Sequence, residues 1–175
     1  MKASVYIATS LDGYIAREDG SLDWLPGSDG SGEDYGYQAF MESVDVLVLG
    51  RNSYETVRAF GQWPYGDKAV LVLTSRPLEI PAEIAGTVEA QAWSSQEVID
   101  QLAARGANHL YVDGGNTIQR FLRSGLIQQL IITRIPVLIG SGIPLFGSLD
   151  HDVRLRHTKT QAFASGLVQS TYEVV

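Results

Sequence analysis

Residues 109–117 read His-Leu-Tyr-Val-Asp-Gly-Gly-Asn-Thr, an apolar run that ends in two glycines and leads directly into a helical pattern. Gly114 and Gly115 let the backbone approach a neighbouring group closely, because neither residue carries a Cβ. The helix that follows presents free N–H groups and the positive end of its dipole, which favour an anion. This stretch therefore predicts a strand–turn–helix unit that is suited to a phosphate; the alternative is a tight turn without a ligand.

A second turn of the same kind follows another apolar run. Residues 46–53 read Val-Leu-Val-Leu-Gly-Arg-Asn-Ser, and a short helix capped by Asn52 or Ser53 is expected next. Four consecutive apolar residues predict a strand that is buried on both faces, as in parallel sheets. Two such units in one chain favour a ligand site over two unrelated tight turns.

The composition excludes several classes of protein. The 175 residues include no cysteine, which excludes disulfides and thiolate metal sites, and the three histidines are too scattered to suggest a zinc site. The net charge of −7 argues against a nucleic-acid surface. The sequence has no apolar run of transmembrane length and no signal-peptide pattern at its start. We therefore expect one cytoplasmic domain over residues 1–175, without metal ion, nucleic acid or membrane as partners.

Short apolar, β-branched runs alternate with helical patterns along the chain. The strands are expected at residues 5–8, 46–49, 69–73, 88–92, 110–112 and 129–135. The helices are expected at residues 34–43, 53–60, 97–105 and 117–124, and the chain ends in a hairpin of residues 154–163 and 167–174. This alternation predicts an α/β fold with helices on both faces of a mostly parallel central sheet and an antiparallel hairpin at one edge.

Residues 17–33 form the longest irregular stretch, too long for an ordinary connection. It is rich in glycine, but it also contains Leu22, Trp24 and Leu25. Apolar side chains in a long loop need a surface to cover. We interpret the stretch as a lid over the ligand site; a disordered insert is the alternative.

Distinctive residues follow four of the expected strands. They read Ala-Thr-Ser-Leu-Asp-Gly at 8–13, Gly-Arg-Asn-Ser at 50–53, Thr-Ser-Arg-Pro at 74–77 and Asp-Gly-Gly-Asn-Thr at 113–117. Ligands of open α/β sheets bind beyond the carboxyl ends of the strands. Helix N-termini suit a pyrophosphate, and arginine beside hydroxyls suits a phosphate monoester. A dinucleotide with a 2′-phosphate meets both demands, although the usual GxGxxG motif is absent.

In this order, the motifs resemble the dihydrofolate reductase-like superfamily and, within it, the reductase domain of riboflavin biosynthesis. The resemblance runs from Val5 to the final strand and implies a three-layer αβα fold. It is carried by Ser10-Leu-Asp-Gly-Tyr-Ile15, Asp23-Trp-Leu25, Val46-Leu-Val-Leu-Gly-Arg-Asn-Ser-Tyr-Glu-Thr56, Leu73-Thr-Ser-Arg-Pro77, Tyr111-Val-Asp-Gly-Gly-Asn-Thr117 and Gly125-Leu-Ile127. The most specific segment, Ile-Pro-Val-Leu-Ile-Gly-Ser-Gly-Ile-Pro-Leu-Phe-Gly at 135–147, resembles the riboflavin branch more than true dihydrofolate reductase.

The resemblance implies NADPH as the hydride donor. Arg51 would bind its 2′-phosphate, assisted by Ser75 and Arg76. The other residues implied to contact the cofactor are Ala8, Ile15, Gly50, Ser53, Tyr54, Thr74, Val112, Gly114, Gly115, Asn116 and Thr117. In dihydrofolate reductases the matching Gly-Gly peptide is cis, and we expect the same here.

The resemblance also implies residues for the substrate half of the site. Asp34, at the start of the first expected helix, is the leading candidate for organising proton transfer, with Asp23 and Glu33 as alternatives. An aspartate at this position is equally a helix N-cap. Trp24 would pack near the reaction centre. Lys68 corresponds most nearly to the arginine that binds the folate carboxylate, although a lysine lacks the bidentate fork.

Three hypotheses follow for function. The first is an NADPH-dependent reductase of a small heterocycle, a pteridine or a ribosylamino-pyrimidine; dihydrofolate reductase activity proper is its alternative. The second is a non-catalytic NADPH-binding module, and the third is a structural domain with a vestigial pocket. The zinc deaminase domain that is often fused to this reductase is not expected, because the histidine and cysteine ligands are missing. The apolar residues 130–138 and the final hairpin predict a homodimer through a sheet edge.

Overall fold

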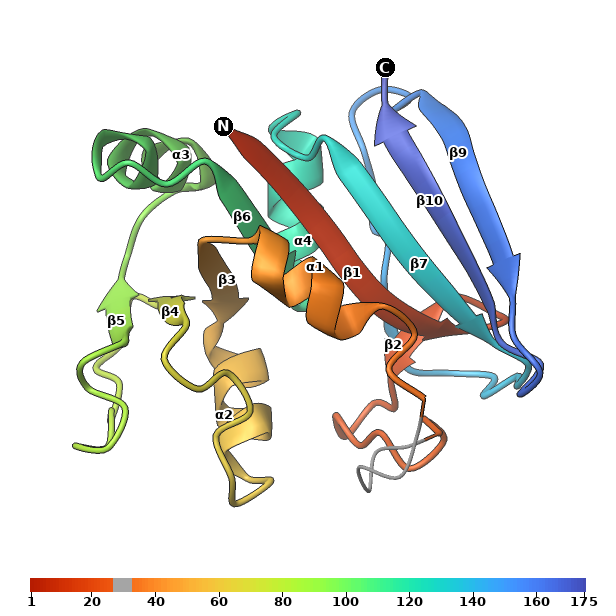
Figure 1. Cartoon of the computed structure of the whole chain (residues 1–175), viewed down its shortest axis with the longest axis horizontal. Coiled ribbons are helices and arrows are strands. Elements are labelled where there is room, and N and C mark those ends of the chain that lie inside the picture. Colours follow the sequence, from red (N-terminus) through yellow and green to blue (C-terminus); the bar gives the residue numbers. More distant parts are fainter. Residues whose placement is uncertain (27–32) are drawn as a thin grey trace.

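The computed structural model describes residues 1–26 and 33–175, and it is built around an eight-stranded sheet (Figure 1). The strand order is β5-β4-β3-β6-β1-β7-β10-β9. Every neighbouring pair is parallel except β7 with β10 and β10 with β9. The strands are β1 (Lys2–Ser10), β3 (Val46–Gly50), β4 (Ala69–Leu73), β5 (Val88–Gln91), β6 (His109–Asp113), β7 (Gln129–Ile135), β9 (Leu155–Ala162) and β10 (Val168–Val174). The expected mostly parallel sheet with a C-terminal antiparallel hairpin is confirmed.

Helices cover both faces of the sheet, which gives the expected three layers. The helices are α1 (Tyr37–Ser43), α2 (Arg51–Arg58), α3 (Ser95–Ala104) and α4 (Gly115–Arg123). The apolar run of β3 serves both faces, because Leu47 and Leu49 pack with Phe40 of α1, whereas Val48 packs with the side chains of α3 and α4. In Figure 1, α1 crosses the near face and α4 lies behind the strands. Among the described residues, no helix is long and apolar enough to cross a membrane.

The starts of the helices show which local sequence signals predicted them correctly. The capping box of α3 is present, with Ser94 Oγ accepting the Glu97 N–H and the Glu97 carboxylate accepting the Ser94 N–H. The expectation that Asn52 or Ser53 caps the second helix is wrong, since α2 begins at Arg51 with Gly50 as its N-cap and no side-chain cap. The first helix begins at Tyr37, three residues later than expected.

A small second sheet pairs β2 (Tyr14–Ala16) with β8 (Ile143–Pro144). Both strands are too short to show an alternation of apolar and polar residues in the sequence. A Cβ at Gly142 would overlap the carbonyl oxygen of Ala16, so a glycine is required where the two segments meet. The carboxylate of Asp12 accepts the N–H groups of Ile139 and Gly140, which ties the turn after β1 to the segment before β8.

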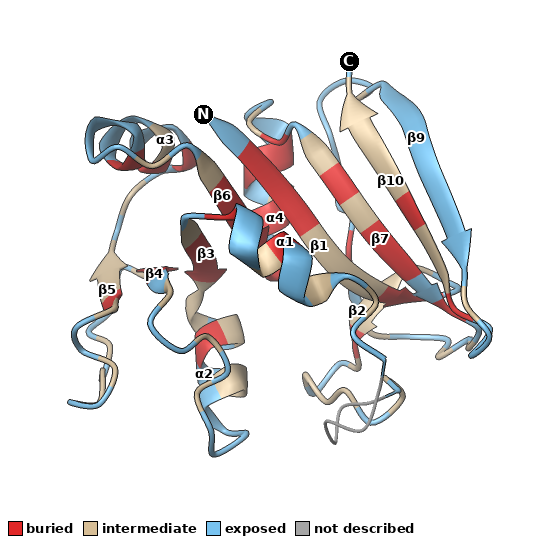
Figure 2. Ribbon diagram, viewed as in Figure 1, coloured by how far each residue is buried: buried red, intermediate tan, exposed pale blue. Residues whose placement is uncertain are grey.

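The sheet edge formed by β9 is exposed along its whole length (Figure 2). By contrast, β7 lies between β1 and β10, and Leu130, Ile132 and Ile135 are buried. The expectation that residues 130–138 contribute a dimer edge is therefore wrong for the β7 part of that run. A homodimer through the β9–β10 hairpin stays a prediction.

Candidate active site

The two glycine turns lie side by side at the carboxyl edge of the sheet, because β3 and β6 are neighbouring parallel strands. A Cβ at Gly114 would overlap Ser53 Oγ, and a Cβ at Gly50 would lie 2.8 Å from Thr117 Oγ1. Each glycine thus makes room for a hydroxyl side chain from the other turn. The N-termini of α2 and α4 are brought together in this way, at the place where open α/β sheets bind ligands.

The peptide between Gly114 and Gly115 is trans, so the expected cis bond is wrong. Gly114 reaches its turn instead through a φ of 92° and a ψ of 132°, a conformation that L-residues with a Cβ rarely adopt. Positive φ at a glycine achieves the sharp change from β6 to α4 without an isomerised peptide. A Cβ at Gly115 would lie 3.0 Å from Ile15 Cδ1 and 3.4 Å from the Pro144 carbonyl oxygen, so the small β2–β8 sheet lies against the start of α4.

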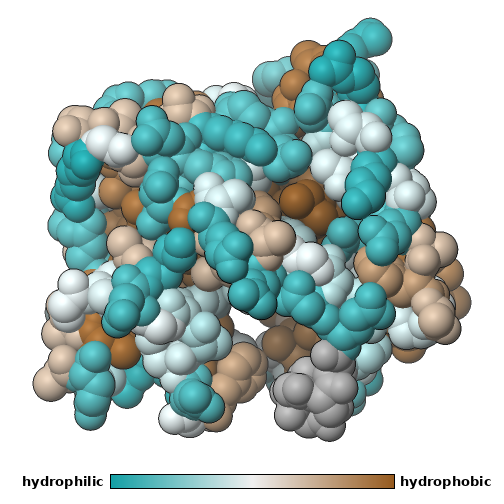
Figure 3. All heavy atoms as spheres, in the orientation of Figure 1, coloured by the Kyte–Doolittle hydropathy of each residue, from teal (hydrophilic) through white to brown (hydrophobic). Residues whose placement is uncertain are grey.

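The molecular surface is hollowed at this edge. Figure 3 shows a gap in the surface below α1 that is bordered on one side by the spheres over α2. The described part of the predicted lid forms compact turns, in which Arg17 pairs with Asp23 at 2.5 Å. Residues 27–32 of the lid lie outside the described residues. Trp24 keeps its indole Nε1 buried without a hydrogen-bond partner among the described residues, as does Trp63.

A cavity of about 400 Å³ lies beside α2 and contains three arginines. It brings together four predicted residues, Arg51, Thr74, Ser75 and Arg76, with two that sequence reasoning missed, Trp93 and Arg120. Arg120 lies three residues after Thr117 on α4, so the i,i+3 spacing was a usable signal that it shares a face with the glycine turn. Trp93 follows β5, whose carboxyl end belongs to the same edge of the sheet.

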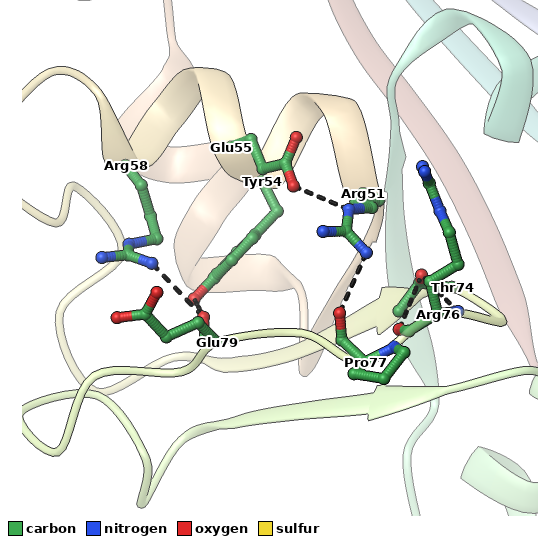
Figure 4. Close-up of polar contacts among 8 residues, drawn as sticks. All are labelled: Arg51, Tyr54, Glu55, Arg58, Thr74, Arg76, Pro77 and Glu79. Atoms are coloured by element: carbon green, nitrogen blue, oxygen red, sulfur yellow. Dashed lines mark hydrogen bonds and ion pairs between the residues drawn. The ribbon is translucent and has the colours of Figure 1, made fainter.

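Arg51 is already engaged within the protein (Figure 4). Its Nε donates to Glu55 Oε1 at 2.6 Å, and its Nη1 donates to the Pro77 carbonyl oxygen at 3.0 Å. The first bond lies within α2, and the second joins the first turn of α2 to the segment that follows β4. Thr74 Oγ1 accepts the Arg76 N–H at 3.1 Å, which shapes the turn from which the Arg76 side chain extends.

Two predicted cofactor residues have inaccessible side chains. Tyr54 is fully buried, and its hydroxyl donates to the Glu79 carbonyl oxygen at 2.9 Å. Val112 is also fully buried, in the core under α4. Only the backbone of Tyr54 and Val112 is therefore left to contact a cofactor, and their predicted role stays a prediction; Ala8, Ile15, Ser53 and Asn116 keep exposed or partly exposed positions.

The predicted acids are engaged elsewhere. The Asp34 carboxylate accepts the N–H groups of Gly36 and Gln38, both at 3.0 Å, so it holds the start of α1 from two residues before the N-cap residue, Gly36. The hydrogen bond and charge of Arg17 lower the pKa of Asp23. Lys68 donates to the Val44 carbonyl oxygen at 2.7 Å, at the amino end of β4, whereas the glycine turns lie at the carboxyl end. The structure does not bring Lys68 together with the predicted cofactor residues.

Asp113 is the acidic residue that sequence reasoning missed. It ends β6 directly before the glycine pair, and burial raises its pKa to about 6, even though the Gly114 N–H bonds to it. Burial, followed by the negative charge of Asp113, raises the pKa of both Tyr37 and Tyr65. Both phenols therefore lie within electrostatic range of the carboxyl group. The sequence did offer a signal for Asp113, because a carboxyl group that directly follows a buried apolar strand can be desolvated and its pKa raised.

The comparisons with known proteins show the family and the fold of the chain. The sequence model of the RibD C-terminal domain matches residues 2–169, and the chain belongs to this family. The uncharacterized protein YwjB of Bacillus subtilis (strain 168) is 38% identical over 167 residues, which cover 95% of this chain and 94% of YwjB.

Two solved structures share the fold. A protein of Shewanella sp. PV-4, provisionally assigned to riboflavin biosynthesis, has a TM-score of 0.92 and 42% identity, with 100% of this chain and 99% of that chain covered. A diaminohydroxyphosphoribosylaminopyrimidine deaminase/5-amino-6-(5-phosphoribosylamino)uracil reductase of Thermotoga maritima has a TM-score of 0.76 and 11% identity, with 99% of this chain and 56% of that chain covered. The chain thus has the fold of a riboflavin-biosynthesis reductase domain.

Proposed function

We propose that this protein is an NADPH-dependent reductase of a small heterocycle, either a pteridine or a ribosylamino-pyrimidine. The cavity with Arg51, Arg76 and Arg120 beside the paired glycine turns carries this proposal. Two adjoining helix N-termini suit a pyrophosphate, and guanidinium groups suit the phosphate monoester that distinguishes NADPH from NADH. The residues present therefore fit a 2′-phosphorylated dinucleotide.

NADPH would supply a hydride to the substrate when bound, and the protein's own residues would orient the substrate and hold a proton. Asp113 is the proposed proton donor. A carboxyl group with a pKa of about 6 is partly protonated near neutral pH, as a general acid must be. The phenols of Tyr37 and Tyr65 lie within electrostatic range of Asp113, and we propose that they bind polar atoms of the heterocycle.

The first experiment separates cofactor binding from catalysis. We expect NADPH to raise the melting temperature of the wild type more than NADH at equal concentration, since a ligand of the native state stabilises it by mass action. Equal shifts would contradict NADPH specificity, and the absence of both shifts would favour a structural domain.

The second experiment follows NADPH absorbance with two substrates side by side, dihydrofolate and 5-amino-6-(5-phosphoribosylamino)uracil. Oxidation with the second supports the riboflavin-type reductase, and oxidation with dihydrofolate alone would identify a dihydrofolate reductase. Tight NADPH binding without turnover of either would favour a non-catalytic module.

The role of Asp113 has a matched control in Asp34. Asp113→Asn should lower kcat about 100-fold or more, because general acid catalysis contributes roughly that factor, with NADPH binding unchanged. Asp34→Asn should keep kcat within about threefold, because asparagine also caps helices. The reverse result would restore Asp34 as the acid.

A further inference from the structure

The backbone is strained directly before α1. Tyr35 has a φ of 54°, and among the described residues no other residue except glycine has a positive φ. Gly36, the N-cap of α1, follows with a φ of 88°. A tyrosine rarely adopts this left-handed conformation, because its Cβ then crowds the backbone. Such a conformation persists only where the surrounding contacts hold it, and residues of this kind gather at functional sites.

The contacts that hold Tyr35 come mainly from the C-terminal hairpin. Its ring packs edge-on against Phe163, with the ring centroids 4.8 Å apart and an angle of 87° between the rings. Its hydroxyl donates to Ser165 Oγ at 3.3 Å. Its carbonyl oxygen accepts from Gln169 Nε2 at 3.1 Å and from the Tyr6 hydroxyl at 2.8 Å. The β9–β10 turn and the start of β10 therefore fix the chain just before α1.

The same segment carries Tyr37, the first residue of α1. Its ring lies edge-on to Tyr6, with the centroids 5.5 Å apart, and to Tyr111, with the centroids 6.5 Å apart. Tyr6 contacts both ends of this short segment, since its hydroxyl also bonds to the Tyr35 carbonyl oxygen. Tyr37 lies within electrostatic range of Asp113. A displacement of Tyr35 should therefore move the Tyr37 phenol relative to Asp113.

We propose that Tyr35 and the β9–β10 hairpin form a clamp that positions the phenol of Tyr37 for the substrate. The clamp consists of Tyr35, Phe163, Ser165 and Gln169, which are positioning residues and do not touch the reacting atoms. This role rests on the proposed reductase function, in which Tyr37 binds a polar atom of the heterocycle. Strands β1 and β7 separate the hairpin from β6 and its glycine turn, so the clamp acts on the substrate half from outside it.

The test first removes the clamp from the hairpin side. With the heterocycle that the wild type reduces, Phe163→Ala should raise KM about fivefold and keep kcat within about twofold, because a misplaced phenol loses about one neutral hydrogen bond to the bound substrate. The affinity for NADPH should stay within about twofold. Phe146→Ala is the matched control, since Phe146 is an exposed phenylalanine in the segment that follows β8. An equal rise of KM in both variants would overturn the inference, because it would show a general loss of packing.

Tyr35→Gly removes the clamp from the side of α1 and keeps the test open if Phe163→Ala folds poorly. Glycine adopts a positive φ without strain, which offsets part of the lost ring contact. We expect the same rise of KM, whereas Tyr35→Phe, which keeps the ring, should leave KM within about twofold. In a Tyr37→Phe background, Phe163→Ala should add nothing, since the clamp acts through that phenol. An unchanged KM in both Phe163→Ala and Tyr35→Gly, or additive effects with Tyr37→Phe, would overturn the inference.

A second readout does not depend on turnover. In protein with labelled tyrosine rings, the NMR signals of Tyr37, assigned with Tyr37→Phe, should shift in Phe163→Ala and Tyr35→Gly but not in Phe146→Ala. Unshifted signals would overturn the clamp and leave the proposed function intact. If the wild type reduces neither heterocycle, the proposed function fails, and the same signals still decide whether the hairpin positions Tyr37.

Discussion

The two halves of the carboxyl edge differ in charge and in how the chain builds them. The proposed cofactor half combines two glycine turns, at the ends of β3 and β6, with three arginines that line one cavity. The proposed substrate half combines one half-buried carboxyl group, Asp113, with the phenols of Tyr37 and Tyr65. The difference teaches that a chain with net charge −7 can still place three of its 13 arginines and lysines around one cavity at this edge.

In the proposed cofactor half, the largest effect is expected from a substitution in the glycine turn before α4. Gly114→Ala places a Cβ against Ser53 Oγ at a positive φ, so we expect a loss of about 3 kcal/mol in the free energy of unfolding, from backbone strain and overpacking together. Gly125→Ala is the control, since Gly125 also has positive φ but open space around it, and should cost about 1 kcal/mol. Urea unfolding measures both; equal losses would show that the contact with Ser53 is unimportant.

The proposed substrate half is tested by how the stability of Asp113→Asn, relative to the wild type, changes with pH. The pKa of Asp113 is raised in the folded protein to about 6, so the folded state holds a proton that the unfolded chain releases. The stability that this proton contributes is complete below about pH 4 and is lost as the pH rises through about 6. At pH 7 we therefore expect Asp113→Asn to be more stable than the wild type by about 1–3 kcal/mol.

The measurement for Asp113 is the melting temperature from pH 4 to 8. The difference between variant and wild type should grow across pH 4–6 and then level off. Asp150→Asn, at an exposed position, should show no such growth. A constant difference for Asp113→Asn would mean that the carboxyl group is not desolvated.

The smallest effect concerns the start of α1, which borders the substrate half. Asp34→Ala removes the acceptor of two N–H groups and should cost about 1 kcal/mol, whereas Asp34→Asn should cost less than about 0.5 kcal/mol. Thermal unfolding of both variants provides the check. A loss of stability in Asp34→Asn as large as in Asp34→Ala would show that the charge, and not the cap, is what α1 requires.

Most of the fold could be predicted, because the signals for its elements are local. Apolar runs located the central strands, and Ser94 with Glu97 marked the start of α3. The β2–β8 pair could not be predicted, since its strands have three and two residues and depend on the contact of Gly142 with Ala16. The prediction of a dimer edge at residues 130–138 was also wrong for the part that forms β7, because packing and not composition decides the order of the strands.

The candidate site divides in the same way. By itself, the sequence determined that two strands end in glycine turns and that arginines and hydroxyls follow them, because conformation and chemical type are properties of each short stretch. Only the tertiary structure decided that Arg51 is paired while Arg120 lines the cavity, and that Asp113 is desolvated. The physical reason is that the engagement and the pKa of a side chain depend on neighbours that are distant in the sequence and are brought close only by folding.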